Sequence, residues 1–320
     1  MDLDDILQPF QGQRVSFPLS YLGLPITTGR LRLIHLQSVV DRALNKMAGW
    51  QEKLLNLGGR RELVRSVLSA IPTYILSALR TPKQFTKTID KARRRFFWAG
   101  NQQLHGGKCK VNWTRVQRPI SRGGLGVTNL EKFSRALKLR WLWFEWHDPD
   151  KPWIGTELPV DDIDRALFTA CTKVTVHNGK KASFWNSSWL NGISPATLFP
   201  QLHLHSKRKN RTVASALSED NWIRDVAHNL SPPILDAFFQ LWSIIDSFQP
   251  SLTDDGEDTL VWKLSADGLY SFCSAYHAQF IGGTDSLFPS KGWRVWAPAK
   301  CKIFLWLLLQ DRVWTAARLQ

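Results

Sequence analysis

The sequence is poor in the features that mark secreted, membrane-spanning and zinc-binding chains. Its four cysteines, Cys109, Cys171, Cys273 and Cys301, form no Cys-x-x-Cys pair, so a closed thiolate zinc site has no support. We expect free, buried thiols in a reducing compartment. The longest apolar run, Ile303–Leu309, is far shorter than the roughly 20 residues that a membrane span needs. Because the N-terminus is acidic and has no apolar core, we expect no signal peptide and an intracellular protein.

Acidic residues are scarce in the first half of the chain. Residues 1–150 hold 25 Lys and Arg against 11 Asp and Glu, whereas residues 151–320 hold 17 against 16. Nearly all of the net charge of +15 therefore lies in the first half, which is typical of a protein that binds a polyanion such as nucleic acid. The alternatives are a solvated basic surface without a partner and an anionic membrane surface. A membrane partner is less favoured, because the apolar stripes of the basic helices are expected to be buried in the protein core.

The hydrophobic content of 43% is enough for buried cores in 320 residues. The spacing of the apolar residues predicts a mainly α chain with small antiparallel β elements, an α+β fold. We expect a helical bundle followed by a second domain with a β-hairpin around residues 174–186, which turns at Asn178-Gly179 with a type I′ geometry. The predicted segments are a short β segment, a basic helical region, a connecting region that contains the hairpin, and a final domain: 1–28, 29–150, 151–255 and 256–320.

Two helices are predicted at the start of the basic region. The first runs from about Arg30 for six turns and ends at Gly58-Gly59. Its inward residues recur at helical spacing: Leu36, Val40, Ala43, Met47 and Leu54. The second helix turns Leu63, Val64 and Leu68 inward and Arg61 and Arg65 outward, and Pro72 ends it or bends it.

A third predicted helix carries a row of cations. Thr81 is its expected cap, Pro82 its first residue, and Phe85, Ile89, Ala92 and Phe96 its buried stripe. The cations lie along a different face: Lys83, Lys87, Lys91 and Arg94. Such a row repels itself by a few tenths of a kcal/mol per pair, which is understandable if phosphates bind there. A fourth helix begins near Asn129 and ends at Asp148.

The sequence offers no convincing catalytic or metal-binding group. None of the three Asp-Asp pairs, Asp4-Asp5, Asp161-Asp162 and Asp254-Asp255, has the aromatic residue and the flanking strands of a polymerase hairpin. We expect Asp161-Asp162 to begin a helix, where acids complement the helix dipole. His203 and His205 could share one strand face but have no third ligand, so surface histidines are favoured. We therefore expect no catalytic residue, no metal and no cofactor.

Several blocks of the chain together resemble the reverse transcriptases of plant LINE-type retrotransposons, the non-LTR class. The first is SFPLSYLGLP (residues 16–25), and the next is KLLNLGGRRELVRSVLSAIPTY with the following PKQF, IDKARRRFFWAG and SRGGLGVTNLEKFSRALKLRWLW. Further along stand KVTVHNGKKASFWNSSWL, WKLSADGLYSFCSAY and WRVWAPAKCKIFLWLLLQDRVWTAARL. The blocks cover most of the chain in the order found in that family.

The resemblance implies a role in nucleic-acid binding. It makes Tyr21-Leu22-Gly23 the centre of the primer grip, the basic helices a thumb that follows a template–primer, and the last segment the start of a zinc-binding domain. The family's catalytic palm with its aspartates, and its Cys/His cluster, have no counterpart in this sequence. We therefore expect a nuclear, non-catalytic fragment that binds template–primer RNA or DNA without polymerising. The expected contacts are Tyr21, Gly23, Arg60, Arg61, Lys83, Lys87 and Arg94.

Two alternative functions stay open. The chain could be an interaction or structural protein that docks on a complete reverse transcriptase through an exposed apolar edge at Phe304, Trp306, Leu307 and Trp314. It could also be a decayed transposon remnant with no selected function. An active polymerase is disfavoured, because the metal-binding carboxylates are missing. For the tryptophans of the basic half, such as Trp98 and Trp141, core packing is favoured over base stacking.

Overall fold

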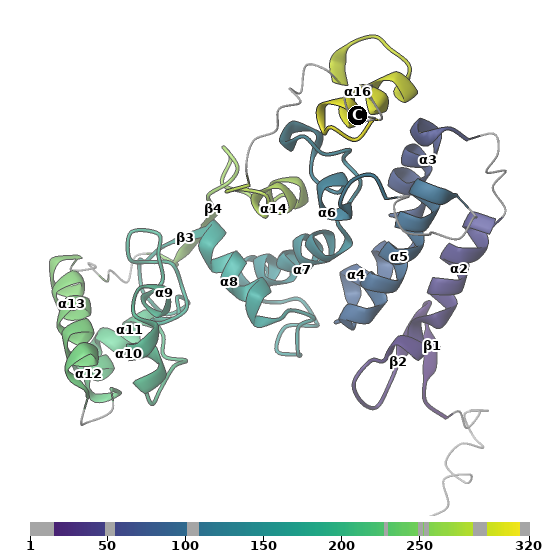
Figure 1. Ribbon diagram of the computed structural model, residues 1–320. Coiled ribbons are helices and arrows are strands. Elements are labelled where there is room, and N and C mark those ends of the chain that lie inside the picture. Colours follow the sequence, from purple (N-terminus) through teal and green to yellow (C-terminus); the bar gives the residue numbers. More distant parts are fainter. Residues whose placement is uncertain are drawn as a thin grey trace, which may run out of the picture. The chain divides into compact units, whose positions relative to one another are not determined.

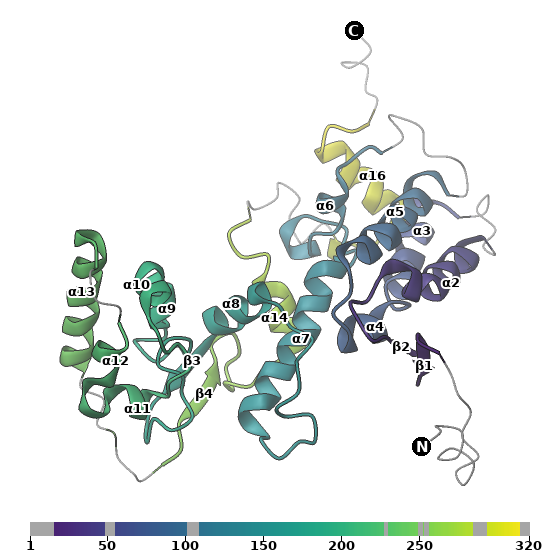
Figure 2. The same ribbon diagram turned by 90° about the horizontal axis from the view of Figure 1, so that it is seen from below.

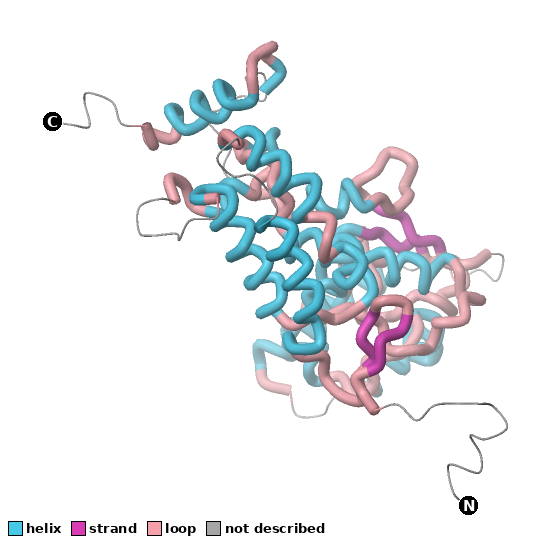
Figure 3. The backbone as a smooth tube through the Cα atoms, turned by 90° about the vertical axis from the view of Figure 1, so that its right-hand side faces the viewer, coloured by secondary structure: helices cyan, strands magenta, loops and turns pink. Residues whose placement is uncertain are grey.

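The computed structural model describes residues 16–48, 55–100, 109–226, 230–248, 252, 256–283 and 293–313, which fold into two compact units (Figure 1). Unit 1 comprises residues 1–134 and 280–320, and unit 2 comprises residues 135–279. The expected mainly α fold with small antiparallel β elements is confirmed: in the described part, two pairs of short strands stand among helices (Figure 3). The unit boundaries differ from the predicted divisions after residues 150 and 255. The described residues 293–313 belong to the first unit and not to the unit that precedes them in the sequence.

Unit 1 is built mainly from helices that enclose two apolar clusters. In chain order, its elements are β1 (Leu19–Tyr21), β2 (Leu24–Ile26), the 3-10 turn η2 (Leu33–Leu36), α2 (Gln37–Ala48), α3 (Leu57–Leu63), the π-helical turn η4 (Val64–Leu68), α4 (Thr73–Ala78), α5 (Lys83–Ala99), α6 (Trp113–Val116), η5 (Ile120–Arg122), the start of α7 (Leu130–His147) and α16 (Ala299–Leu309). Helix α5 packs against α2 and α3 and supplies much of the core.

The N-terminal strands lie in the short β segment that is predicted for residues 1–28. β1 pairs with β2 in antiparallel register, with Tyr21 opposite Leu24. The two turn residues, Leu22 and Gly23, both have positive φ angles of 50° and 80°. A two-residue turn with both φ angles positive matches the right-handed twist of the strands that it joins.

The helices of the first predicted pair begin and end differently from expectation. Leu36, Val40, Ala43 and Met47 are buried as predicted, whereas residues 49–54, which include Leu54, lie outside the described part. Gly58-Gly59 does not end a helix but lies in the first turn of α3. There the side chain of Asn56 accepts hydrogen bonds from both glycine N–H groups, at 2.9 and 3.1 Å. The N-cap side chain bonds to N–H groups that would otherwise have no partner, and so a helix can begin at these glycines. The glycine pair by itself does not show this.

Helix α5 begins at Lys83, one residue later than predicted. Pro82 is the N-cap, with extended backbone and no side-chain capping bond, so Thr81 does not cap the helix. The proline ring fixes φ near −65°, an angle compatible with this extended N-cap as well as with a first helical residue. The predicted stripe of Phe85, Ile89, Ala92 and Phe96 is buried.

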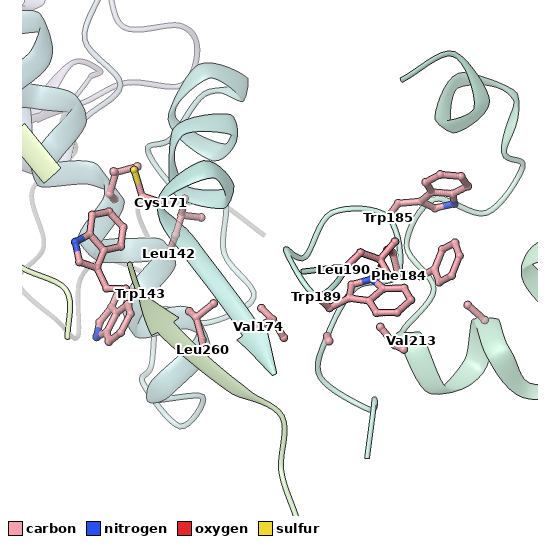
Figure 4. Packing of buried hydrophobic residues seen from close by; sticks show 14 of the residues in the cluster. Leu142, Trp143, Cys171, Val174, Phe184, Trp185, Trp189, Leu190, Val213 and Leu260 are labelled. Carbon is pink, nitrogen blue, oxygen red and sulfur yellow. Dashed lines mark hydrogen bonds between the residues drawn. The ribbon is translucent and has the colours of Figure 1, made fainter. Parts of the chain in front are cut away.

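Unit 2 surrounds a single large apolar cluster rich in tryptophan (Figure 4). Its elements are the rest of α7, α8 (Asp162–Cys171), β3 (Thr172–Thr175), α9 (Pro195–Leu198), α10 (Pro200–His205), α11 (Val213–Leu217), η6 (Ser218–Asp220), α12 (Asn221–Arg224), α13 (Pro232–Phe248), β4 (Thr259–Trp262) and α14 (Phe272–Ala278). Trp185, Trp189 and Trp262 are each at most 2% exposed. As predicted, Asp161 caps α8 and accepts a 2.8 Å hydrogen bond from the N–H of Asp164.

The predicted hairpin around residues 174–186 is wrong. β3 pairs with β4 in an antiparallel register that sets Val174 opposite Leu260, 86 residues farther along. The segment after β3 is instead held by the buried carboxylate of Asp258. Its Oδ1 accepts hydrogen bonds from the N–H groups of His177 (2.8 Å) and Gly179 (2.9 Å), and its Oδ2 from those of Lys181 (3.0 Å) and Ala182 (2.8 Å). A distant carboxylate thus replaces the hairpin partner.

All four cysteines are free, but Cys109, Cys273 and Cys301 are exposed, so only Cys171 is buried as expected. Among the described residues, no helix combines the length and the apolar character that a bilayer crossing requires.

Candidate nucleic-acid interface

One face of α5 presents a straight row of exposed cations. Lys83, Lys87, Lys91 and Arg95 recur every four residues and are all exposed, while the opposite face is buried. Residues four apart on a helix are neighbours on its surface. The row therefore runs the length of the helix. Arg95 was missed in the sequence, although one further step of four residues from Lys91 reaches it.

The lysines of this row have no acidic partner in the described part of the chain. Among the described residues, none lies within ion-pair distance of Lys83, Lys87 or Lys91. Asp90, on the same helix, faces inward: its Oδ1 accepts a 2.6 Å hydrogen bond from Arg93, and its Oδ2 accepts one of 3.0 Å from Gln117. The positive charge of the row is thus available to an external anion.

Arg94, the fourth residue of the predicted row, is only half-exposed. Its Nε is buried and has no hydrogen-bond partner in the described part of the chain. Both arginines follow Lys91 on the outer half of the helix, which advances 100° per residue, but only Arg95 is exposed. Arg95 therefore continues the exposed row better than Arg94 does.

Arg61 is not at the surface, contrary to the sequence prediction. Its side chain is buried, its Nε donates a 2.7 Å hydrogen bond to the carbonyl of Leu125, and its guanidinium lies 5.0 Å from the ring centre of Trp293. Burial, together with the nearby Arg65, lowers the pKa of Arg61, although Glu62 opposes the shift. Arg61 holds the glycine-rich loop 123–126 rather than a ligand. Its neighbour Arg60 is half-buried, and its Nε donates to the carbonyl of Leu55 at 3.1 Å.

The other predicted contacts lie on the N-terminal hairpin. Tyr21 is 63% exposed, and Gly23 is in the turn. A Cβ atom at Gly23 would lie 4.0 Å from the ring of Tyr74, which places this turn beside α4 (Figure 2). Tyr21 is thus accessible to a ligand. The hairpin and the α5 row both belong to unit 1.

A buried network of hydrogen bonds connects α5 to its neighbours. The sequence did not indicate this network. Arg93 is 1% exposed. Besides its bond to Asp90, its guanidinium donates to Ser69 Oγ at 2.7 Å and to the carbonyl of Thr128 at 2.9 Å. Gln117 accepts a bond from Asn129 at 3.1 Å. The network joins α5 to two loops and fixes the helix that carries the exposed row.

The next features are the tryptophans of the basic half and the predicted apolar edge near the C-terminus. Trp98 and Trp143 are buried and Trp141 is partly buried, in agreement with core packing. Of the expected apolar edge, Phe304 is 54% exposed, but Trp306 and Leu307 are buried; Trp314 lies outside the described residues.

The two histidines of the predicted pair lie on a helix, α10, and not on a strand. The ring of His203 lies 5.4 Å from that of Trp185, and burial, with a smaller effect of Lys209, lowers its pKa. In the described part of the chain, no three His, Cys, Asp or Glu side chains are placed to share a metal ion.

Comparison with known proteins adds one distant relative. The chain is 25% identical over 327 positions to a protein of Arabidopsis thaliana that carries the name "putative ribonuclease H protein". The alignment covers 91% of this chain and 51% of that protein, so the chain spans about half its length. No protein-family model matches the chain, and no solved structure is similar to it.

Proposed function

We propose that the chain is part of a retrotransposon-derived, reverse-transcriptase-like protein that binds a template–primer through the cation row of α5 and does not polymerise. The observation that carries the proposal is the row itself: Lys83, Lys87 and Lys91 are exposed, and no carboxylate of the described residues pairs with them. Phosphate contacts of this kind are independent of sequence and position the backbone of a duplex. A nuclear location and an association with a complete reverse transcriptase belong to the same proposal.

Two further observations support it. Tyr21, in the motif that resembles a primer grip, is exposed on the hairpin of the same unit. The name of the plant relative refers to a ribonuclease, which is in keeping with a nucleic-acid partner. A second candidate function is docking on another reverse transcriptase chain. It is favoured by one face of α16, on which Phe304, Leu305, Leu308 and Leu309 are exposed.

The test neutralises the row in the full chain. The triple variant Lys83→Gln, Lys87→Gln, Lys91→Gln should bind a labelled RNA–DNA primer–template about a hundredfold more weakly at about 0.1 M salt. The slope of log K against log salt should become less steep by about 2 to 3, because each lost phosphate contact removes about 0.9. Fluorescence anisotropy at several salt concentrations measures both quantities.

The matched control removes three exposed cations from unit 2: Arg140→Gln, Lys173→Gln, Arg224→Gln. Its affinity and salt slope should stay close to those of the unchanged chain. Equal losses in the two triple variants would mean that net charge alone drives binding, and the row would have no special role. Primer extension with Mg²⁺ by the unchanged chain would contradict the non-catalytic part of the proposal.

A further inference from the structure

Trp296, in unit 1, is the most exposed tryptophan of the described residues. It is 100% exposed, the next is Trp242 at 47%, and the other described tryptophans are buried or half-buried. The neighbouring Val295 is exposed as well. A single apolar residue at the surface needs no explanation by itself. Trp296 differs from such a residue in two ways: the loop that carries it is anchored, and cations flank it.

The first anchor of the loop, residues 293–298, is Trp293. Its ring centre lies 5.0 Å from the guanidinium of Arg61, and its backbone carbonyl accepts a 3.0 Å hydrogen bond from Nζ of Lys302. Arg61 is itself buried. The start of the loop is therefore fixed to the core of unit 1.

The other end of the loop leads into α16, which packs against α3 (Figure 2). The buried face of α16 belongs to the same apolar cluster as the C-terminal part of α5. Where α16 begins, Ala299 lies so close to α3 that a Cβ atom added at Gly58 would be 2.8 Å from the Cβ of Ala299. Because both ends of the loop are held, little additional ordering is needed when a ligand packs on the indole between them.

Cations flank Trp296, and its segment contains no carboxylate. Residues 286–310 include four Lys and Arg and no Asp or Glu. Arg294 and Lys300 are exposed, and among the described residues neither lies within ion-pair distance of a carboxylate. They stand two residues before and four residues after Trp296. Since a chain spans at most about 3.6 Å per residue, their Cα atoms lie within about 14 Å of that of Trp296.

An accessible aromatic ring with cations beside it is the combination with which proteins hold single-stranded nucleic acids. A base stacks on the ring, and the flanking phosphates bind the cations. The bases inside a duplex are already stacked on one another, so the ring selects unpaired bases. Phosphates of a duplex remain available to the α5 row, whose last member, Arg95, lies in the part of α5 that shares a cluster with α16.

We propose that Trp296, Arg294 and Lys300 form a site for unpaired bases of a nucleic acid. The indole stacks on one base, and the two cations bind the phosphates on either side of it. The inference rests on the function proposed for unit 1 and narrows its ligand: a template–primer with a single-stranded overhang binds more tightly than a blunt duplex.

The first test is Trp296→Ala in the full chain, with two labelled probes, a 12-nucleotide oligouridylate and a blunt RNA–DNA duplex. Affinity for oligouridylate should fall about tenfold with an unchanged salt slope, because a stacking contact is lost and no phosphate contact. Affinity for the blunt duplex should stay within about twofold. Trp296→Phe should retain most of the affinity for oligouridylate. Because the side chain is fully exposed, both variants should keep the thermal midpoint of the unchanged chain.

The matched control is Trp242→Ala. This tryptophan is also exposed, but it lies on α13, which contains no Lys or Arg. Its substitution should leave the affinity for oligouridylate unchanged. If Trp296→Ala binds oligouridylate as tightly as this control, or loses as much affinity for the blunt duplex as for oligouridylate, the proposal is overturned.

The second test removes the two cations and keeps the indole. The double variant Arg294→Gln, Lys300→Gln should bind oligouridylate about tenfold more weakly at about 0.1 M salt. Its salt slope should become less steep by about 1.4, at about 0.7 for each phosphate on a single strand. A slope equal to that of the unchanged chain would mean that these side chains hold no phosphate, and the site as proposed would be wrong.

Failure of this site can be distinguished from failure of the function proposed for α5. If the Lys83, Lys87, Lys91 variant keeps its affinity for the blunt duplex while Trp296→Ala loses oligouridylate, the role of the α5 row fails and the single-strand site stands. The opposite pattern, loss of duplex binding in the α5 variant and no loss in Trp296→Ala, overturns the single-strand site alone.

Two other partners of an exposed indole are outcomes of the same variants. Vesicles with about 30% phosphatidylserine test a membrane surface, and sedimentation velocity tests a second copy of the chain. If Trp296→Ala loses vesicle binding, or turns a dimer into a monomer, and keeps its affinity for oligouridylate, the indole serves that partner and the proposal is overturned.

Discussion

Two buried charged side chains, Arg93 in unit 1 and Asp258 in unit 2, each organise their surroundings through several hydrogen bonds. Arg93 bonds to Asp90, Ser69 and Thr128. Asp258 receives four backbone N–H groups. A buried charge is costly unless it is hydrogen-bonded, and most of the groups that bond to these two side chains are distant in the sequence. Such residues determine local structure without leaving a local pattern.

The Asp258 carboxylate should contribute measurably to the stability of unit 2. In the variant Asp258→Asn, the amide nitrogen would face N–H donors that now bond to a carboxylate oxygen. Leaving buried donors unsatisfied costs about 1–3 kcal/mol each, so we expect the free energy of unfolding to fall by about 2–4 kcal/mol. Urea unfolding followed by tryptophan fluorescence measures this loss. The amides of His177, Gly179, Lys181 and Ala182 should also exchange their hydrogens faster.

The control for this variant is Asp267→Asn, an exposed carboxylate that accepts one backbone bond, from Leu269 at 3.0 Å. It should lose clearly less stability than Asp258→Asn. If the two variants were equally stable, the four-donor arrangement would have no particular energetic role.

The same carboxylate gives the stability of unit 2 a defined pH dependence. Burial alone would raise the pKa of Asp258, but the four N–H donors outweigh it and hold the pKa below its ordinary value. Because the folded pKa is lower than the unfolded one, about 3.9, this stabilisation is complete at neutral pH and is lost as the pH falls through the folded pKa. Acid unfolding of the Asp258→Asn variant should therefore begin from lower stability and lack this contribution.

At the scale of elements, periodicity predicted the helices well and their ends poorly. The apolar spacing of α2 and α5 identified the buried residues, because one face of a helix must meet the core whichever element covers it. The start of α3 at Asn56 depended on one side-chain cap, and a glycine pair was mistaken for a stop. The Arg61 side chain was expected outside, but the loop 123–126 covers it.

That loop is packed so closely that a side chain at one of its glycines would clash with the backbone. A Cβ atom at Gly124 would lie 2.0 Å from the carbonyl oxygen of Arg118. The variant Gly124→Ala must therefore shift the backbone of the loop, and we expect it to lower the free energy of unfolding by about 1–3 kcal/mol. Gly29→Ala is the control, because nothing lies within 4 Å of its Cβ position. Equal stability of both variants in urea unfolding would contradict the close packing.

For the whole molecule, the two units divide charge and core between them. The basic excess lies in the first half of the sequence, and the tryptophan-rich cluster lies in unit 2. The units have separate apolar clusters in the described residues. A substitution in the core of one unit should therefore change the stability of that unit and not that of the other.

This separation predicts additivity. The double variant Gly124→Ala, Asp258→Asn combines one change in each unit, so its loss of unfolding free energy should equal the sum of the single losses within about 0.5 kcal/mol. Global urea unfolding of the four proteins of this cycle gives the coupling energy. A coupling above about 1 kcal/mol would show that the two sites are not energetically independent.

By itself, the sequence determined the fold class, the buried stripes of α2 and α5, and the charge imbalance, because composition and periodicity are properties of neighbouring residues. Only the tertiary structure decided the partner of β3, the burial of Arg61 and the four N–H donors of Asp258. Each of these depends on contacts between residues distant in the chain: β3 pairs with β4 and not with residues 182–186, and the carboxylate of Asp258, 79 residues away, accepts a hydrogen bond from the N–H of Gly179. Such pairings are selected by burial and hydrogen bonding in the complete fold, which local patterns do not contain.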